Sequence, residues 1–209
     1  MLKKGAMQLV RNSINEQLYE IIKEKILLTE FSLGEQINLK ELADEFNVST
    51  MPVRDALFRL INEGLVENRS RVGFFVRSFT TEEISDIMEV RQLYELYCLD
   101  NYFDNIDQKR VARCLDRCSK LDPSSRRRFD ELDEEIHDLL INASQNKCLM
   151  KSYKEVKNQI IIFRHLDKDR IPLANEEHKC LLQAILDGEK DEAIRILRRH
   201  IRRVASAIL

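Results

Sequence analysis

The sequence contains few of the residues that interrupt helices. Its 209 residues include only 5 glycines and 3 prolines, while 33% of the residues are charged. Leucine, isoleucine, glutamate, lysine and arginine recur in long runs with a helical spacing of 3.6 residues. This composition excludes collagen-like and low-complexity chains, and it predicts a mostly helical protein with enough apolar residues for a core.

Long uncharged apolar runs are also absent. No stretch approaches the roughly 18 to 20 residues that a membrane span requires. The opening stretch, MLKKGAMQLVRNSINEQ, lacks the apolar segment of a signal peptide. We therefore expect a cytoplasmic protein with no membrane partner.

Neither an excess of positive charge nor a paired set of cysteines is present. The formal net charge is −2, so any binding of nucleic acid must depend on a local basic surface. The cysteines are odd in number and fall inside helical patterns, which predicts reduced, packed thiols rather than disulfides. Two of them lie four residues apart, but a zinc site of cysteines would need a second pair. The five are Cys98, Cys114, Cys118, Cys148 and Cys180.

The glycines divide the chain into two parts. Gly34, Gly64 and Gly73 separate short elements in the first 78 residues, whereas residues 79–209 contain only Gly188. This contrast predicts two domains, 1–78 and 79–209.

The first part has the pattern of a winged helix-turn-helix. A helix over about 15–29 precedes Asn38, which with Glu41 forms a capping arrangement before the short helix LKELADEF. Ser49 is a second N-cap, and the helix MPVRDALFRLINE that follows it ends at Gly64. LVEN and GFFVRSF are rich in β-formers and separated by RSRV, so they predict a two-stranded hairpin. Short helix, turn, second helix and hairpin together predict this fold.

The second part shows no strand pattern. The sequence TTEE supplies a capping box at its start, and apolar residues recur with helical spacing to the end of the chain. We expect an all-helical bundle with helices near 81–103, 107–119, 125–144, 147–166, 174–186 and 190–208. The predicted fold class is therefore mainly α, with a winged head followed by a helical ligand-binding domain.

A helix-turn-helix reads DNA with the start of its second helix. Arginine can bind guanine or phosphate, the hydroxyls can bind either, and methionine can contact a thymine methyl group. Basic residues and a glycine in the hairpin would let the backbone approach a groove. Helical pairs of this kind also occur in proteins that never bind DNA, so spacing alone leaves that alternative open. The candidate residues are Lys40, Ser49, Thr50, Met51, Arg54, Arg69, Arg71 and Gly73.

An acid and three histidines occupy inward positions in the second part. Asp133 and His137 lie four apart on the apolar stripe of one predicted helix, where an unpaired charge is costly. His178 and His200 fall on the inner faces of two other helices. Three nitrogens and one oxygen suit a divalent transition metal such as zinc, nickel or manganese. Each histidine taken singly also fits a hydrogen-bonded core residue, so the residues alone leave both interpretations open.

The head resembles the winged-helix domain of the GntR family of bacterial transcription regulators over about residues 15–77. Two departures from the family pattern stand out: Thr50 and Met51 replace an arginine and a threonine, and Leu33 replaces a proline. The first removes a DNA contact that the family commonly makes, so we expect a different operator sequence. The matching residues are Leu42-Ala43, Val48-Ser49, Pro52-Val53-Arg54, Ala56-Leu57, Leu60, Gly64-Leu65 and Gly73.

The second part resembles the helical FCD domain found in the FadR branch of that family. The segments that match are MEVRQLYE, DEEIHDLLINASQN and EEHKCLLQAILDGEKDEAIRILRRH. This resemblance implies that Asp133, His137, His178 and His200 hold a divalent metal, with zinc favoured, and that a small carboxylate effector binds there. Arg91 is the candidate for reading the rest of the effector, whereas His165 has no counterpart in the pattern and is expected to be structural.

These expectations combine into a hypothesis of function. We expect a homodimeric transcription regulator, of the repressor kind, that reads an inverted repeat in double-stranded DNA and responds to the effector. Two alternatives stay open: a metal-dependent enzyme, or a regulator whose metal is purely structural. Arginine runs at 126–128 and at 198, 199, 202 and 203 are interpreted as solvated faces.

Overall fold

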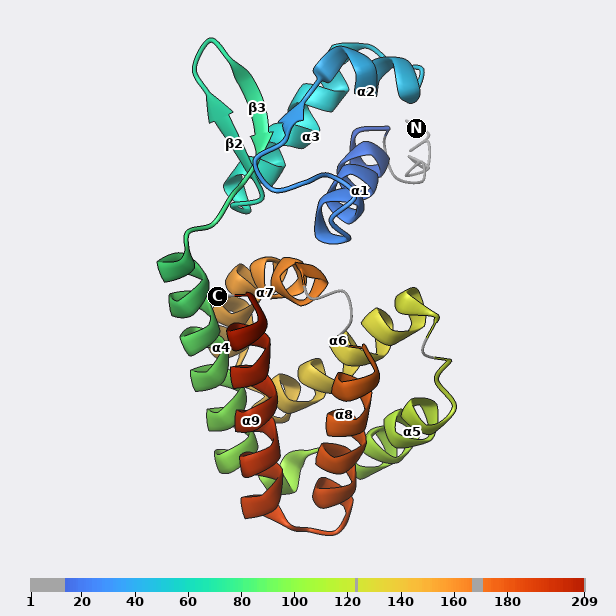
Figure 1. The fold of residues 1–209 in the computed structure, drawn as a ribbon, viewed down its shortest axis with the longest axis vertical. Coiled ribbons are helices and arrows are strands. Elements are labelled where there is room, and N and C mark those ends of the chain that lie inside the picture. Colours follow the sequence, from blue (N-terminus) through green and yellow to red (C-terminus); the bar gives the residue numbers. More distant parts are fainter. Residues whose placement is uncertain (1–13, 123, 167–170, 209) are drawn as a thin grey trace, which may run out of the picture. The chain divides into compact units, whose positions relative to one another are not determined.

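The chain forms two compact units that divide between Ser78 and Phe79. The structure is a computed structural model, and it describes residues 14–122, 124–166 and 171–208. Figure 1 traces both units, each of which is described by itself below. In the described ranges, no helix is long and apolar enough to cross a membrane.

The first unit is a winged helix-turn-helix. Its three helices are α1 (Ile14–Leu27), α2 (Leu39–Glu45) and α3 (Thr50–Asn62). Its strands, β1 (Gln36–Ile37), β2 (Val66–Arg69) and β3 (Gly73–Val76), form an antiparallel sheet in the order β1-β3-β2. The sequence predicts a two-stranded hairpin, but the wing has a third strand, because Gln36 and Ile37 pair with Phe75 and Phe74.

The turn between α2 and α3 sets the direction of the DNA-reading helix. Asn38 caps α2 by accepting hydrogen bonds from the backbone nitrogens of Lys40 and Glu41. The chain leaves α2 through Asn47, whose φ of 51° reverses its direction. Ser49 then has the extended backbone of an N-cap, without a side-chain capping bond, and α3 begins at Thr50. Val53, Leu57 and Leu60 of α3 are buried, which holds one face of the helix inside and leaves the other exposed.

The second unit is an all-helical bundle. Its main helices are α4 (Thr81–Asn101), α5 (Gln108–Ser119), α6 (Arg126–Ala143), α7 (Lys147–Leu166), α8 (Ile171–Leu186) and α9 (Lys190–Ile208), with a short turn of 3₁₀-helix, η1 (Phe103–Asn105), after α4. Helix α4 packs against α6, α7 and α9, while α8 packs against α5 and α9 (Figure 1). The interior of the unit is therefore enclosed by α4, α6, α8 and α9, whose inner faces meet.

Local signals account for most of the helix ends. Thr80 and Glu83 form the predicted capping box at the start of α4. Helix α8 already includes Ile171, three residues before the predicted start, because proline is tolerated in a first helical turn and Pro172 does not break the helix. The expectation that all cysteines are packed was wrong for Cys148 and Cys180, which are exposed. All five cysteines are free thiols.

Candidate metal centre and DNA-reading surface

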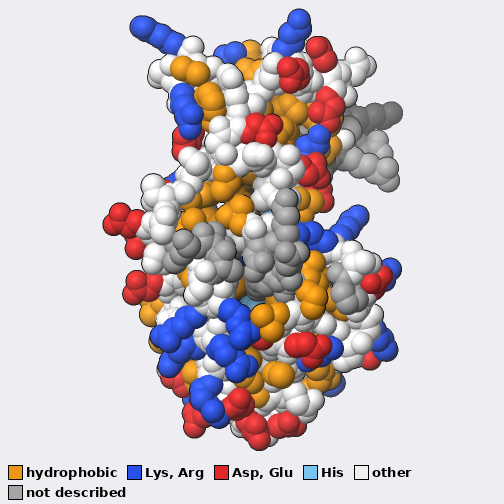
Figure 2. Space-filling model, viewed as in Figure 1, with side chains coloured by type: hydrophobic (Ala, Val, Ile, Leu, Met, Phe, Trp, Pro, Cys, Tyr) orange, Lys and Arg blue, Asp and Glu red, His pale blue; other side chains and the backbone are white. Residues whose placement is uncertain are grey.

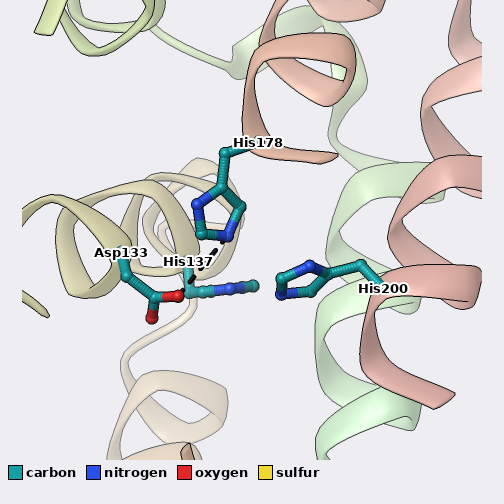
Figure 3. A group of neighbouring side chains, drawn as sticks. All are labelled: Asp133, His137, His178 and His200. Atoms are coloured by element: carbon teal, nitrogen blue, oxygen red, sulfur yellow. Dashed lines mark ion pairs between the residues drawn. The ribbon is translucent and has the colours of Figure 1, made fainter. Parts of the chain in front are cut away.

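Four side chains of the helical unit converge on one point. Asp133 and His137 come from α6, His178 from α8 and His200 from α9, and all point toward one another (Figure 3). One donor atom from each lies within 4.8 Å of the donor atom of every other. Each of the four residues exposes at most 3% of its surface. The sequence placed these residues on separate inner stripes, and the structure brings them together.

The three imidazoles surround a small space beside the carboxylate. The ring centroids of His178 and His200 are 4.7 Å apart, and those of His137 and His200 are 5.3 Å apart. Nε2 of His178 lies 3.4 Å from Oδ1 of Asp133. In a tetrahedral site with bonds of about 2.1 Å, donors are about 3.4 Å apart. The His178–Asp133 pair already has this spacing, and donors that are up to 4.8 Å apart would need to close by about 1.4 Å at most. The residues present therefore fit a small divalent ion.

Two buried carboxylates orient two of the histidines. Nδ1 of His137 lies 2.7 Å from Oε2 of Glu95, and Nδ1 of His200 lies 2.9 Å from Oε2 of Glu177. In neutral rings these nitrogens donate to the carboxylates, so Nε2 is the nitrogen that could act as a ligand in each ring. In His137 a metal would have to replace the contact that Nε2 makes with Nη2 of Arg91. Carboxylate partners of this kind fix the tautomer of metal-binding histidines and raise their basicity.

Glu95 is charged although it is fully buried. Burial would raise the pKa of this carboxyl group, but nearby Arg91 and His137 hold the pKa well below its usual value. Nε of Arg91 donates to Oε1 of Glu95 over 2.8 Å, and the hydroxyl of Tyr153 donates to the same oxygen over 2.7 Å. Glu95 therefore ties α4 and α7 to the histidine on α6.

The guanidinium of Arg91 lies beside the four donors. Its side chain is fully buried, and Nη2 lies 2.9 Å from Nε2 of His137. Its other terminal nitrogen, Nη1, has no hydrogen-bond partner among the residues that the structure describes. Arg91 also lines a cavity of about 10 Å³, together with Tyr153, Lys157 and Arg164. Arg164 contacts Asp133, so two guanidinium groups reach the four donors.

His165 and the cysteine pair Cys114 and Cys118 are not part of this group of four donors. His165 is buried beside Arg126, whose Nε donates to Nδ1 of the ring over 3.2 Å. Burial, followed by the charges of Arg126 and Arg164, lowers the pKa of His165 to about 4. Burial also raises the pKa of Cys114 to about 11 and that of Cys118 to about 12, so both stay protonated thiols at neutral pH.

Several residues around the centre were missed from the sequence. Glu95 and Glu177 were not predicted to contact histidines, nor was Arg164 predicted to contact Asp133. Glu95 is four residues after Arg91 in a helix, and this spacing signals a possible pair. Nothing in the local sequence assigns Glu177 to His200, because that contact depends on how α8 and α9 pack.

The predicted DNA-reading residues lie on the exposed face of the head. Ser49, Thr50, Met51 and Arg54 are exposed at the start of α3, and the side chain of Met51 is 63% accessible. Lys40 is exposed near the start of α2. These positions match the end of α3 that the sequence predicts to face DNA.

A groove of about 770 Å³ lies between α3 and the wing. Arg54, Arg71 and Gly73 line it, as do Gln36 and Asn68, which the sequence analysis did not select. Gly73 has φ of 129°, a conformation open mainly to glycine, and Nε2 of Gln36 would lie 3.3 Å from an added Cβ. In the wing, the guanidinium of Arg69 lies 4.1 Å from the centre of the Phe75 ring.

Comparison with known proteins identifies the family. Residues 14–76 match the bacterial regulatory proteins of the gntR family, and residues 86–203 match the FCD domain. The chain therefore belongs to the GntR family, in the group with a C-terminal FCD domain, as the resemblance predicted. It is a DNA-binding transcription regulator.

Individual relatives agree with this assignment. The chain is 30% identical to the Nta operon transcriptional regulator of Aminobacter aminovorans, across 86% of this chain and 87% of the relative. A transcriptional regulator GntR from Rhodococcus sp. RHA1 has the same fold, with a TM-score of 0.79 at 20% identity over 94% of this chain and 98% of that one. The Zn²⁺-bound FCD domain of TM0439 is 32% identical, with a TM-score of 0.58 over 63% of this chain and 95% of that domain. That domain has also been solved free of metal.

Proposed function

We propose that this regulator changes its affinity for DNA when a small organic acid binds at a divalent metal in the helical domain. The observation that carries the proposal is the buried group of Asp133, His137, His178 and His200, with Arg91 beside it. Three imidazoles and one carboxylate whose donor atoms lie within 4.8 Å of one another form the kind of ligand set that divalent transition ions prefer.

Zinc is the ion that we favour, with nickel and manganese as alternatives. Zinc accepts nitrogen and oxygen ligands in a tetrahedral arrangement, and it also expands to a fifth ligand. The four residues would supply the protein ligands, while Glu95 and Glu177 hold His137 and His200 in the required tautomer. A metal bound in this way supplies a Lewis-acidic position that can take a carboxylate oxygen.

The charges around the centre favour an acid with at least two carboxylates. A divalent ion together with Arg91 and Arg164 brings four positive charges, while Asp133 and Glu95 bring two negative ones. Lys157 does not add to the excess, because it pairs with Glu134 and Asp138 at 2.7 and 2.8 Å. We infer that one effector carboxylate meets the metal and another meets Nη1 of Arg91.

Effector binding would have to move α7. The cavity beside Arg91 measures about 10 Å³, which holds about one water molecule and no organic acid. Tyr153, Lys157 and Arg164 on α7 form one side of it. An acid that enters must displace this helix, and a ligand that prefers one arrangement of the domain can shift the DNA-bound population.

We assign DNA contacts to the exposed residues of the head. Arg54 and Arg71 would reach base edges or phosphates from two sides of the groove between α3 and the wing. Lys40, Ser49, Thr50, Met51 and Arg69 would make the surrounding contacts, and Gly73 would allow close approach of the backbone. Because the operator lies on DNA, we place the protein in the cytoplasm.

A homodimer reading an inverted repeat is the geometry that we propose. One winged head covers half of an operator, and a two-fold axis matches two heads to two half-sites. Helix α4 carries an apolar strip, Leu93, Leu96 and Tyr97, in which Leu93 is 66% exposed and Tyr97 is 46% exposed. We assign this strip to the contact with a second copy of the chain.

Binding without turnover is the simplest account of the centre. A hydrolytic metal site needs a free general base near the ion. Glu134 and Asp138 line the cavity, but both are held by Lys157. We therefore propose a regulator and no enzyme.

Titration of a labelled operator, selected by binding from random duplexes, tests the proposal. Zinc-loaded protein should change its operator affinity about 10-fold or more when the right di- or tricarboxylic acid is added. Arg91→Gln should remove this response, whereas Arg113→Gln, an exposed change on α5, should keep it. If no acid alters DNA affinity, and removing zinc only lowers the melting temperature, the metal is structural and the proposal is wrong.

A further inference from the structure

The outward face of α9 carries a dense group of arginines. Figure 2 shows blue side chains gathered on the helical domain over this helix. They line a groove of about 400 Å³ that is separate from the metal centre and from the DNA-reading head. We call it the arginine groove, and its lining residues are Arg195, Arg198, Arg199, Arg202, Arg203 and Ser206.

Most of the charge in the arginine groove is not neutralised by the protein. Arg195 pairs with Glu192, and Nη1 of Arg203 lies 2.7 Å from Oε1 of Glu177. Arg198, Arg199 and Arg202 are exposed, and none has a carboxylate within 4 Å in the described part of the chain.

The helix dipole does not explain this arrangement. It favours cations within the last turn of a helix. Helix α9 runs to Ile208, so Arg195 to Arg199 lie more than two turns before its end. The dipole of α9 therefore does not account for the positive charge at Arg195, Arg198 and Arg199.

We propose that the arginine groove binds a small anion with two or more phosphate groups. Guanidinium groups bind phosphate oxygens through paired hydrogen bonds, and several arginines are needed to match a polyphosphate. A volume of about 400 Å³ lies within the range of small-molecule sites. The arginines span about 12 Å of helix, at 1.5 Å per residue, which suits a chain of two or three phosphates better than the long backbone of a duplex.

The arginine groove is connected to the metal centre through one carboxylate. Arg203 holds Oε1 of Glu177, and Oε2 of the same group accepts from Nδ1 of His200 over 2.9 Å. An anion that engages Arg203 weakens its hold on Glu177, and the carboxylate then interacts more strongly with His200. The ring becomes a better ligand at Nε2, so anion and metal binding reinforce each other. This coupling rests on the proposed metal site, whereas anion binding does not.

Calorimetry of the full chain with sodium pyrophosphate tests the site directly. We expect saturable binding that weakens at least 10-fold in the double variant Arg199→Ala, Arg202→Ala. The matched control, Arg127→Ala with Arg128→Ala, removes two exposed arginines from α6 and should bind as the unaltered protein does. Sulfate at the same ionic strength should bind far more weakly, since it offers a single anionic group.

Three results would overturn the anion site. The first is no saturable binding of pyrophosphate, and the second is equal weakening in the control variant. The third is a groove variant that keeps pyrophosphate binding but sediments as a monomer or loses affinity for non-specific duplex. That result would assign the arginines to a subunit contact or to DNA instead.

The link to His200 is tested without metal. In chelator-treated protein labelled with ¹⁵N-histidine, pyrophosphate should shift the imidazole signals of His200, assigned by comparison with His200→Asn. Arg203→Ala should move these signals in the same direction by itself and remove further response to the anion. Unchanged His200 signals would refute the coupling. The anion site is tested separately by the calorimetry, and the metal site is tested separately by zinc analysis.

Discussion

At the scale of single residues, the buried carboxylates decide how the histidines can be used. Glu95 lies between Arg91 and His137, so it both neutralises the arginine and fixes the ring. Glu177 does the same for Arg203 and His200. His137 and His200 would lose their orientation without these partners, although neither Glu95 nor Glu177 would touch the ion.

Glu95→Gln should weaken zinc binding about 10- to 100-fold, because the amide cannot raise the basicity of His137 as a carboxylate does. It should also destabilise the domain, since Arg91 loses its buried counter-charge. Zinc affinity is measured by competition with a chelating dye, and stability by urea denaturation. Glu131→Gln, an exposed change on α6, is the control. Unchanged zinc affinity in Glu95→Gln would refute the role assigned to this acid.

His165 should make stability depend on pH. Its pKa is about 4 in the folded chain and about 6.5 when unfolded, so the unfolded chain takes up the proton first. Stability is therefore complete above about pH 6.5, falls as the pH drops toward 4, and loses up to about 3 kcal/mol. His165→Gln should flatten this dependence in urea denaturation of chelator-treated protein. If the free energy of unfolding of His165→Gln falls between pH 6.5 and 4.5 as steeply as that of the unaltered chain, His165 is not the source of the pH dependence.

At the scale of elements, the helices were predictable and the smallest strand was not. The six main helices of the second unit lie within three residues of their predicted bounds because apolar periodicity and capping residues act locally. Strand β1 has only two residues, Gln36 and Ile37, too few to show alternation. The four donors could be selected because each lies on an apolar stripe. The partners Glu177 and Arg164 could not, since their contacts depend on the packing of separate helices.

The capping box of α4 should contribute measurably to stability. Thr80→Ala removes the hydroxyl that accepts from the backbone nitrogen of Glu83 over 3.1 Å, so we expect a loss of about 1 kcal/mol. Thr81→Ala, one position later and without a capping bond, should change stability far less. Urea denaturation of both variants measures the difference, and equal effects would contradict the capping role.

Helix α3 should supply DNA affinity through Arg54. Arg54→Ala is expected to cost about 1 to 3 kcal/mol of operator binding if the guanidinium contacts a base edge. A contact to phosphate would instead weaken binding to all sequences and reduce the salt dependence by about one unit. Arg113→Ala, which removes the same charge from α5, is the control for operator titrations at several salt concentrations. Equal affinities of the two variants would remove Arg54 from the interface.

At the scale of the whole molecule, the apolar strip on α4 should hold the dimer together. Leu93→Asp buries a charge in that contact, so the protein should sediment as a monomer. Its affinity for the full inverted repeat should fall, while binding to a single half-site should not change. Leu173→Asp alters a leucine that is 49% exposed on α8 and should remain a dimer. A dimeric Leu93→Asp protein would place the contact elsewhere.

The central claim joins residues from three helices around one ion, and X-ray absorption at the zinc edge of the zinc-loaded protein tests it most directly. We predict nitrogen and oxygen neighbours at about 2.0 to 2.1 Å, with the signature of imidazole rings and no sulfur neighbour. His178→Ala should reduce the bound zinc, whereas His165→Gln should retain it. A shell containing sulfur at about 2.3 Å, or zinc that stays bound at full stoichiometry in His178→Ala, would contradict the account.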